Sequence, residues 1–346
     1  MSEEDDRDII DQEIEMLGRI WKEACERAYY NLPAEYVLPE EMKIDPALRS
    51  HLEEREVSLY LRGFDGTVMN GASLELTDNE ILNEIKKIPG LAELSVWVDD
   101  ESGYSFTDND VRQIGDMDRL VNLDLQIERH EIQFNSLSWL QGCRSIRKLR
   151  LVSFPDATGI IPSIRGLTTL QELVLEDMEL DHQSLAAIGE LTDLEIFRAN
   201  GIFANNNCNF MVLSNLAQLR ILSLESCSIS EKHHQLFSQF PCLQEASLSD
   251  TMIGDSVVTF IGRCPQLKVL LMTGCPKVTE QGLETLKGCV SLKTLYVDTS
   301  TLTPQIVRML SEIKSLESVV AHGKATDAVA QAIQKNGKRI WEVWGD

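Results

Sequence analysis

The sequence predicts a curved α/β solenoid, a right-handed superhelix of strand-turn-helix units with a parallel sheet on its concave face. Two observations predict it. Segments of the form LxxLxL recur along the 346 residues, and from Ile146 onward they start at intervals of 24, 24, 25, 24, 24, 25 and 24 residues. The residues that follow each segment carry apolar positions at helical spacing. A fixed period of this length is typical of repeat architectures, in which each unit needs its neighbours to bury a core.

Each segment predicts a half-buried strand, because apolar and polar residues alternate in it. In one unit the strand holds Leu270 and Met272, and the following helix holds Leu283 and Leu286. Strand segments begin at Leu91, Leu120, Ile146, Leu170, Leu194, Leu219, Leu243, Leu267, Leu292 and Leu316.

Helix starts are predicted at residues that cap backbone N–H groups. Thr279, Asp255 and Ser230 are expected N-caps, and Thr303 is followed by Pro304, which suits a first helical position. Strands about 4.8 Å apart lie closer together than helices, so the stack must curve.

These repeats resemble the leucine-rich repeat family over residues 54–346, as about 10–11 repeats of about 24 residues with a C-terminal cap. The unit VLLMTGCPKVTEQGLETLKGCVSLKTL is similar to the cysteine-containing subtype of F-box-associated and ribonuclease-inhibitor-like intracellular arrays, and GIIPSIRGLTTLQEL is similar to a plant-type unit. The resemblance implies a leucine-rich-repeat solenoid that binds a protein or peptide on its concave face.

Both ends of the array are expected to be covered, because a terminal repeat would expose the core. Residues 1–53 predict a helical N-terminal cap, and docking of this helix to another chain is the alternative. Its apolar stripe consists of Ile10, Ile14, Leu17, Trp21, Ala24 and Ala28. At the C-terminus Trp341 and Trp344 are expected to close the core, with partner binding as the alternative. A first strand with an irregular insertion, of which a hairpin is one form, is expected in EVSLYLRGFDGTVMNGASLEL.

The eight cysteines predict buried thiols. They are spread along the chain without a CxxC pair, which favours neither a disulfide framework nor a metal site. Cys227 and Cys275, with Thr251 and Ser300 in the same column, are expected to bond the loop backbone. No apolar run reaches the length of a bilayer helix and the first residues are acidic, so we expect a cytoplasmic protein.

The formal net charge of −23 narrows the class of partner. It disfavours nucleic acid and anionic membranes, whose binding needs clustered Lys and Arg. Basic partners are favoured, and the alternative is that the charge serves solubility alone.

Nothing in the sequence predicts an enzyme or a cofactor. None of the six histidines lies in a nucleophile or metal motif, and no phosphate-binding glycine loop is present. His233 and His234 are expected to be solvated at the start of an outer helix. One alternative to a simple binding module is a substrate-recognition or adaptor subunit of a ubiquitin-ligase-like complex. The alternative from another class is an enzyme-associated regulator or a hydrolase without a recognisable motif.

The candidate site is the ladder of side chains between the inward leucines, in columns expected to begin at Ser58 and Tyr60. It combines an acidic middle, interrupted by Arg150 and Arg198, with an apolar patch of Val269, Leu271 and Tyr296 extended by Val320. The alternative is that these apolar residues are ordinary β-formers. The predicted partner-binding residues are Trp97, Arg150, Glu172, Glu176, Arg198, Glu225, Val269, Leu271, Tyr296, Asp298, Val320 and His322.

Overall fold

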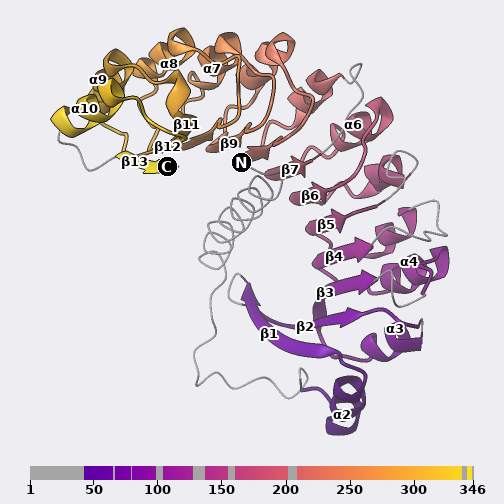
Figure 1. The fold of residues 1–346 in the computed structure, drawn as a ribbon. Helices are drawn as coiled ribbons and strands as arrows, with labels where there is room; N and C mark the ends of the chain where they lie inside the picture. Colours follow the sequence, from indigo (N-terminus) through magenta and orange to yellow (C-terminus); the bar gives the residue numbers. More distant parts are fainter. Residues whose placement is uncertain are drawn as a thin grey trace.

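The computed structural model describes residues 43–64, 67–78, 80–98, 104–127, 137–154, 160–201, 209–336 and 341–344. They form one curved sheet of thirteen strands with helices on its outer side (Figure 1). The apolar stripe predicted between Ile10 and Ala28 lies outside the described residues, so its role as a cap or a docking helix stays a prediction.

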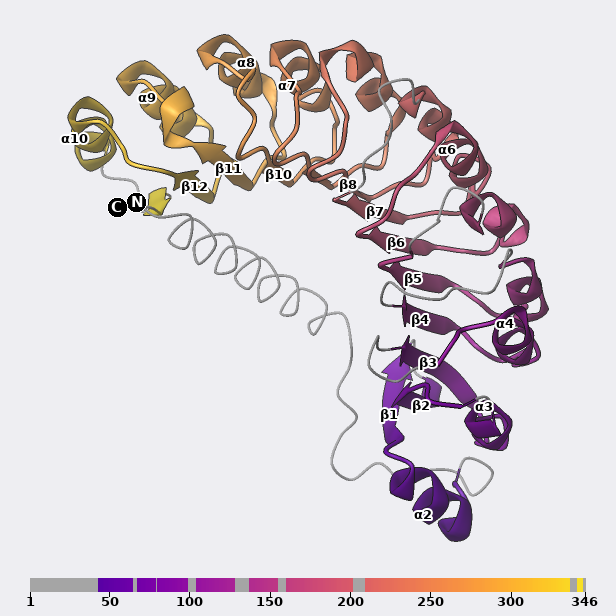
Figure 2. The ribbon, with the colours of Figure 1, turned by 45° about the vertical axis from the view of Figure 1, so that its right-hand side comes forward.

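The strands line the inner side of the arc (Figure 2). They are β1 (Ser58–Phe64), β2 (Thr67–Glu75), β3 (Leu91–Val98), β4 (Asn122–Ile127), β5 (Lys148–Val152), β6 (Glu172–Glu176), β7 (Ile196–Asn200), β8 (Ile221–Ser223), β9 (Glu245–Ser247), β10 (Val269–Leu271), β11 (Thr294–Asp298), β12 (Ser318–His322) and β13 (Trp341–Trp344).

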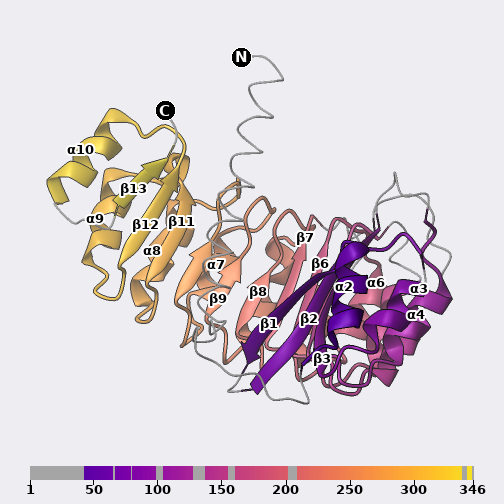
Figure 3. The ribbon, with the colours of Figure 1, turned by 90° about the horizontal axis from the view of Figure 1, so that it is seen from below.

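Short helices form the outer layer, many of them 3₁₀-helices (Figure 3). They are α2 (Pro46–Glu54), α3 (Glu80–Ile85), α4 (Asp108–Gly115), η3 (Ser138–Gly142), η4 (Ile161–Gly166), α6 (His182–Ile188), η5 (Phe210–Asn215), η6 (Glu231–Gln239), α7 (Asp255–Ile261), α8 (Glu280–Thr285), η7 (Leu286–Gly288), η8 (Thr299–Thr301), α9 (Pro304–Glu312) and α10 (Asp327–Asn336).

The order of strands in the sheet is the order of strands in the chain, and all pairs from β2 to β13 are parallel. The first pair differs, because β1 is antiparallel to β2. The predicted insertion is therefore a hairpin. Ser58 is in register with Ser73 and through it with Ser95, so the column predicted to begin at Ser58 does so. Tyr60 pairs with Gly71 and therefore stands in the column of Glu93, so the prediction that it begins the column of Trp97 is wrong.

The recurring leucines form one continuous core between sheet and helices. Leu173, Leu222, Leu270 and Leu295, on β6, β8, β10 and β11, are each 0% exposed. Leu52 of α2 belongs to the same core. The predicted α/β solenoid is confirmed.

Three of the predicted helix caps are present as expected, at Thr279, Thr303 and Ser230. Thr279 accepts from the N–H of Gln281, and Thr303 accepts from the N–H of Ile306, each at 3.2 Å. Asp255 is not an N-cap, because Gly254 holds that position and Asp255 is the first residue of α7. Its carboxylate instead accepts from the N–H and hydroxyl of Thr279 in the next repeat, at 2.8 and 2.6 Å.

The start of η6 overturns the prediction for His233. Ser230 caps this helix, and its N–H donates to Nδ1 of His233 at 3.1 Å. His233 is 5% exposed and packs edge-on against Phe210, so it is not a solvated surface residue. His234 is only partly exposed and lies against Phe260.

The predicted role of the cysteine column is confirmed for three residues. The thiol of Cys227 donates to the carbonyl of Ala199 at 2.8 Å, and the carbonyl of Leu248 accepts from both Cys275 and Thr251, at 3.1 and 2.6 Å. These bonds satisfy carbonyls that would otherwise be buried without a partner.

Ser300 does not share this role. The 3₁₀ turn η8 begins directly after Asp298, and it leaves Ser300 exposed while Thr299 is buried. Thr299 donates to the carbonyl of Lys324 at 3.2 Å.

At the C-terminal end, β13 adds a short strand next to β12. Trp341 packs against the core and donates from its indole N–H to Ser311 at 3.1 Å. Trp344 is 48% exposed, so only the first of the two tryptophans closes the core as predicted.

Candidate functional site

Strand register places the side chains between the inward leucines in columns on the concave face. The first column is Glu93, Asn122, Lys148, Glu172, Ile196, Ile221, Glu245, Val269, Thr294 and Ser318. The second column is Ser95, Asp124, Arg150, Val174, Arg198, Ser223, Ser247, Leu271, Tyr296 and Val320. In the third, Trp97, Gln126, Val152, Glu176 and Asn200 follow one another, and Asp298 pairs with His322.

Repeated leucines thus point into one shared core while the residues between them line the inner wall. The fold is a leucine-rich-repeat solenoid. Of the predicted site residues, the register brings together Val269, Leu271 and Tyr296, and it leaves Trp97 on β3 at the opposite end of the arc.

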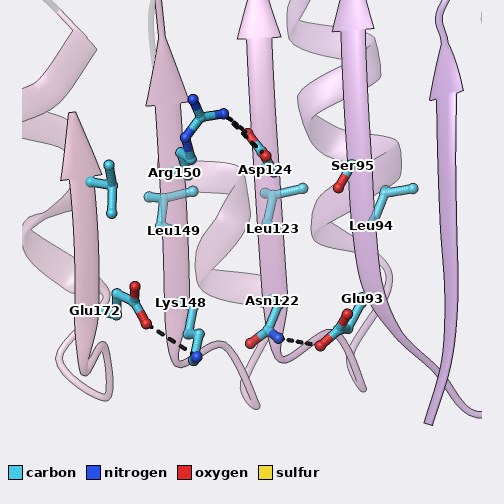
Figure 4. Close-up of a pocket in the computed structure, with 11 residues that line it drawn as sticks. Glu93, Leu94, Ser95, Asn122, Leu123, Asp124, Lys148, Leu149, Arg150 and Glu172 are labelled. Carbon is cyan, nitrogen blue, oxygen red and sulfur yellow. Dashed lines mark hydrogen bonds and ion pairs between the residues drawn. The ribbon is translucent and has the colours of Figure 1, made fainter. Parts of the chain in front are cut away.

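The first half of the concave face, from β3 to β6, pairs its own charges. Arg150 binds Asp124 at 3.1 Å and Glu176 at 2.6 Å, and Lys148 binds Glu172 at 3.1 Å. Of these groups, Asp124, Lys148, Arg150 and Glu172 line a depression of about 230 Å³ (Figure 4).

Burial and pairing act in opposite directions on these charges. Burial raises the pKa of Asp124, and the Arg150 guanidinium only partly offsets this. For Arg150 burial works to lower the pKa, but the carboxylates of Asp124 and Glu176 outweigh it and the pKa lies above its ordinary value. The arginine is therefore held charged between its two carboxylates.

The second half, from β7 to β12, exposes apolar side chains. Val269, Leu271 and Tyr296 are partly exposed, as predicted. Ile196 and Ile221 lie next to each other on β7 and β8 and are also partly exposed. Sequence reasoning missed these two, although each stands directly before the second core position of its segment, in LEIFRA and LRILSL.

An acidic group lies beside this apolar surface. Ser247 donates its hydroxyl to the Glu225 carboxylate. Burial raises the pKa of both Glu225 and Glu245, the neighbouring Asp250 adds to the shift of Glu225, and the positive charge of Arg198 opposes both shifts.

Two predicted site residues are not accessible. Val320 and Arg198 are each 6% exposed, so the prediction that Val320 extends an exposed apolar patch is wrong. Arg198 is a buried positive charge whose field acts on both Glu225 and Glu245.

Three further predicted site residues, Trp97, Asp298 and His322, lie outside both the paired charges and the apolar surface. Trp97 is 38% exposed. Asp298 accepts from the N–H of Gly274 at 2.9 Å, which ties it to the turn of the preceding repeat, and His322 is its neighbour on β12.

The buried cysteines Cys143 and Cys264 are poor nucleophiles. Six of the described cysteines are free thiols, and five of these are buried. Burial raises the pKa of Cys143 and Cys264 to about 12 each, so the thiolate is scarce at neutral pH. Among the described residues no group of three or more His, Cys, Asp or Glu side chains is arranged to hold a metal ion. No helix in that part of the chain is long and apolar enough to cross a membrane.

Comparisons with known proteins find only distant structural likeness. No family model and no curated protein matches the chain. Internalin C2 from Listeria monocytogenes is 18% identical, with 69% of this chain and 83% of that chain covered and a TM-score of 0.39. An internalin (inlF) from the same organism is 13% identical, with 76% and 82% covered and a TM-score of 0.42.

A plant receptor gives a similar result. The ectodomain of the receptor kinase GASSHO1/SCHENGEN3 from Arabidopsis thaliana, solved in complex with CASPARIAN STRIP INTEGRITY FACTOR 2, is 14% identical. The alignment covers 73% of this chain and 33% of that chain, with a TM-score of 0.43. Likenesses at this level carry no argument about what this chain binds.

Proposed function

We propose that this chain is a non-catalytic protein-interaction module that binds a protein or peptide through the second half of its concave face. The observation that carries the proposal is the partly exposed apolar surface on β7, β8, β10 and β11, next to half-buried carboxylates. The surface consists of Ile196, Ile221, Val269, Leu271 and Tyr296, and the carboxylates are Glu225 and Glu245.

Apolar and aromatic side chains on neighbouring strands have the composition of an interface centre, where most binding energy is concentrated. Tyr296 supplies a large rigid ring, and Leu271 lies directly beside it in the register. A partner that covers this surface removes apolar area from water, which favours association at about 25 cal/mol per Å² before the costs of binding.

The charges favour a basic partner. Among the described residues, the charged groups that act on Glu225 are Asp250, Glu245 and the cation Arg198. A lysine or arginine of the partner would offset carboxylates that burial already disfavours as anions. The net charge of −23 acts in the same direction by steering basic partners toward the protein.

The described chemistry supports a non-catalytic role. The buried thiols of Cys143 and Cys264 have raised pKa values, and His233 is occupied as a helix cap. An adaptor function would depend on the stripe between Ile10 and Ala28, which lies outside the described residues. We also propose a cytoplasmic location, which the free and buried thiols support because a reducing compartment keeps cysteines unpaired.

The experiment identifies the partner first and then tests the surface. A photo-crosslinking residue in place of Tyr296 captures the partner, and the purified partner is titrated by calorimetry against Leu271→Asp/Tyr296→Ala and against wild type. We expect the double change to weaken binding at least about a hundredfold, because it removes two central contacts and adds a charge.

Met252→Asp is the matched control, since Met252 is 52% exposed and lies outside the concave columns. It should leave the affinity unchanged. If the double variant melts like wild type and still binds its partner with wild-type affinity, the concave-face proposal is wrong.

A further inference from the structure

A second surface lies on the edge of the array where the outer helices end and the chain returns to the strands. Two depressions, of about 570 and 430 Å³, adjoin there. One lies between the ends of α7 and η7, and the other between the ends of η7 and α9. Val290 and Cys289 line both, and Val290 is 82% exposed. We call the two depressions together the edge groove.

The edge groove is largely apolar and open. Cys264 and Pro265 line its first part, and Met309 and Ile313 line its second. Gly288 adds no side chain, and a Cβ built on it would meet nothing within 4 Å. Val290 therefore stands as an exposed apolar ridge between two hollows that apolar side chains of a ligand could fill.

Positive charges surround the edge groove. Arg263 lines the first depression, Lys287 and Lys314 line the second, and Glu312 is the acidic residue there. Within the described part of the chain none of these three cations takes part in an ion pair, and Arg263 instead lies over the Phe260 ring at 5.1 Å. On a chain of net charge −23, this is a local reversal of sign.

We propose that the edge groove is a second binding surface, which takes an acidic peptide segment of another protein with one apolar side chain in each depression. Among the described residues these cations have no ion-pair partners, and they stand beside an apolar floor, so carboxylates of the ligand would complement them. Neighbouring outer helices pack about 8–10 Å apart, which matches apolar residues three positions apart on a peptide in the polyproline II conformation, whose three residues per turn at about 3.1 Å each put both side chains on one face. The proposal goes beyond the concave face, whose favoured ligand has the opposite charge.

The test uses a short fluorescein-labelled peptide of aspartates and glutamates that carries two leucines three positions apart. Fluorescence anisotropy measures its binding to the full chain. Val290→Asp should weaken binding at least about tenfold, because it puts a negative charge between the two apolar sites. Gly288→Leu should weaken it similarly by filling the first depression, into open space and therefore without disturbing the fold.

Variants that reverse a charge measure how much the cations of the edge groove contribute to peptide binding. Lys287→Glu/Lys314→Glu should weaken binding about tenfold and reduce its dependence on salt. Lys277→Glu makes the same kind of charge change on an exposed lysine outside the edge groove and should have no effect. Leu271→Asp/Tyr296→Ala should also leave this peptide bound, so failure here is distinguishable from failure on the concave face.

Three results would overturn the proposal. One is binding of a lysine-for-acid version of the peptide as tightly as the acidic one. Another is unchanged affinity in the Val290→Asp and Gly288→Leu variants. The third is no peptide binding together with self-association that Val290→Asp abolishes, measured by light scattering, which would show that a second copy of this chain covers the edge groove.

Discussion

The two halves of the concave face have the same strand geometry but different surface chemistry. From β3 to β6, Arg150 and Lys148 are bonded to carboxylates on neighbouring strands, so the charges are satisfied within the protein. From β7 to β12, apolar side chains are partly exposed and carboxylates outnumber the nearby arginine. In the first half the charged side chains therefore have their partners within the protein. In the second half the partly exposed apolar side chains and the carboxylates remain for a binding partner to contact.

The largest expected loss of stability is in the hydrophobic core that lies behind both halves of the concave face. Leu173→Ala behind the first half and Leu270→Ala behind the second should each cost about 3 kcal/mol of unfolding free energy, because both side chains are fully buried. Urea unfolding followed by circular dichroism measures this. A much smaller loss for Leu270→Ala would mean that the second half is loosely packed, and the comparison would then concern stability rather than surface chemistry.

An intermediate loss of stability is expected when an ion pair of the first half is removed. Arg150→Ala should cost about 1–2 kcal/mol, because it leaves Asp124 and Glu176 without their common cation, a penalty reduced by the partial exposure of these groups. Ile221→Ala, on the concave face of the second half, should cost less than about 1 kcal/mol because its side chain is only partly buried. Urea unfolding measures both variants. If Arg150→Ala and Ile221→Ala lowered the urea midpoint by the same amount, the proposed difference between the two halves of the concave face would be contradicted.

The smallest expected effect is a pH dependence in the second half. A carboxyl group whose pKa is raised by folding destabilises the fold when it is ionised, and the penalty disappears as the pH falls below the unfolded value. Glu225→Gln/Glu245→Gln should therefore be more stable than wild type at pH 7, with the difference vanishing below the ordinary pKa of 4.5.

Thermal melts between pH 3 and pH 8 measure this difference, with Glu317→Gln as a control. Glu317 is exposed and pairs with Lys293 at 2.8 Å, so its loss should change stability by less than about 1 kcal/mol. A double variant that is less stable than wild type at pH 7 would show that the two carboxylates are already well satisfied.

Much of the fold could be predicted because the leucine period sets strand positions and register together. Once Leu270 and Leu295 are assigned to the core, their neighbours Leu271 and Tyr296 must face the other way and lie side by side. The direction of β1 could not be predicted in this way, because apolar and polar residues alternate identically along a parallel and an antiparallel strand.

The candidate site was less predictable because exposure depends on neighbouring repeats as well as on a residue's own segment. Val320 occupies the same column as Leu271 and Tyr296, yet it is buried while they are partly exposed. His233 was misjudged for a related reason. Its ring nitrogen caps the helix that it opens, a contact that a pair of adjacent histidines in the sequence does not reveal.

The matching order of strands in sheet and chain has a mechanical consequence. Each strand is bonded only to its immediate neighbours, so tension applied at the two ends would peel the units away one after another instead of rupturing the whole at once. Under gentler loads the molecule would act as a spring, in which slight rotations at successive junctions add up and the distance between the tips of the arc adjusts to the width of whatever is held there.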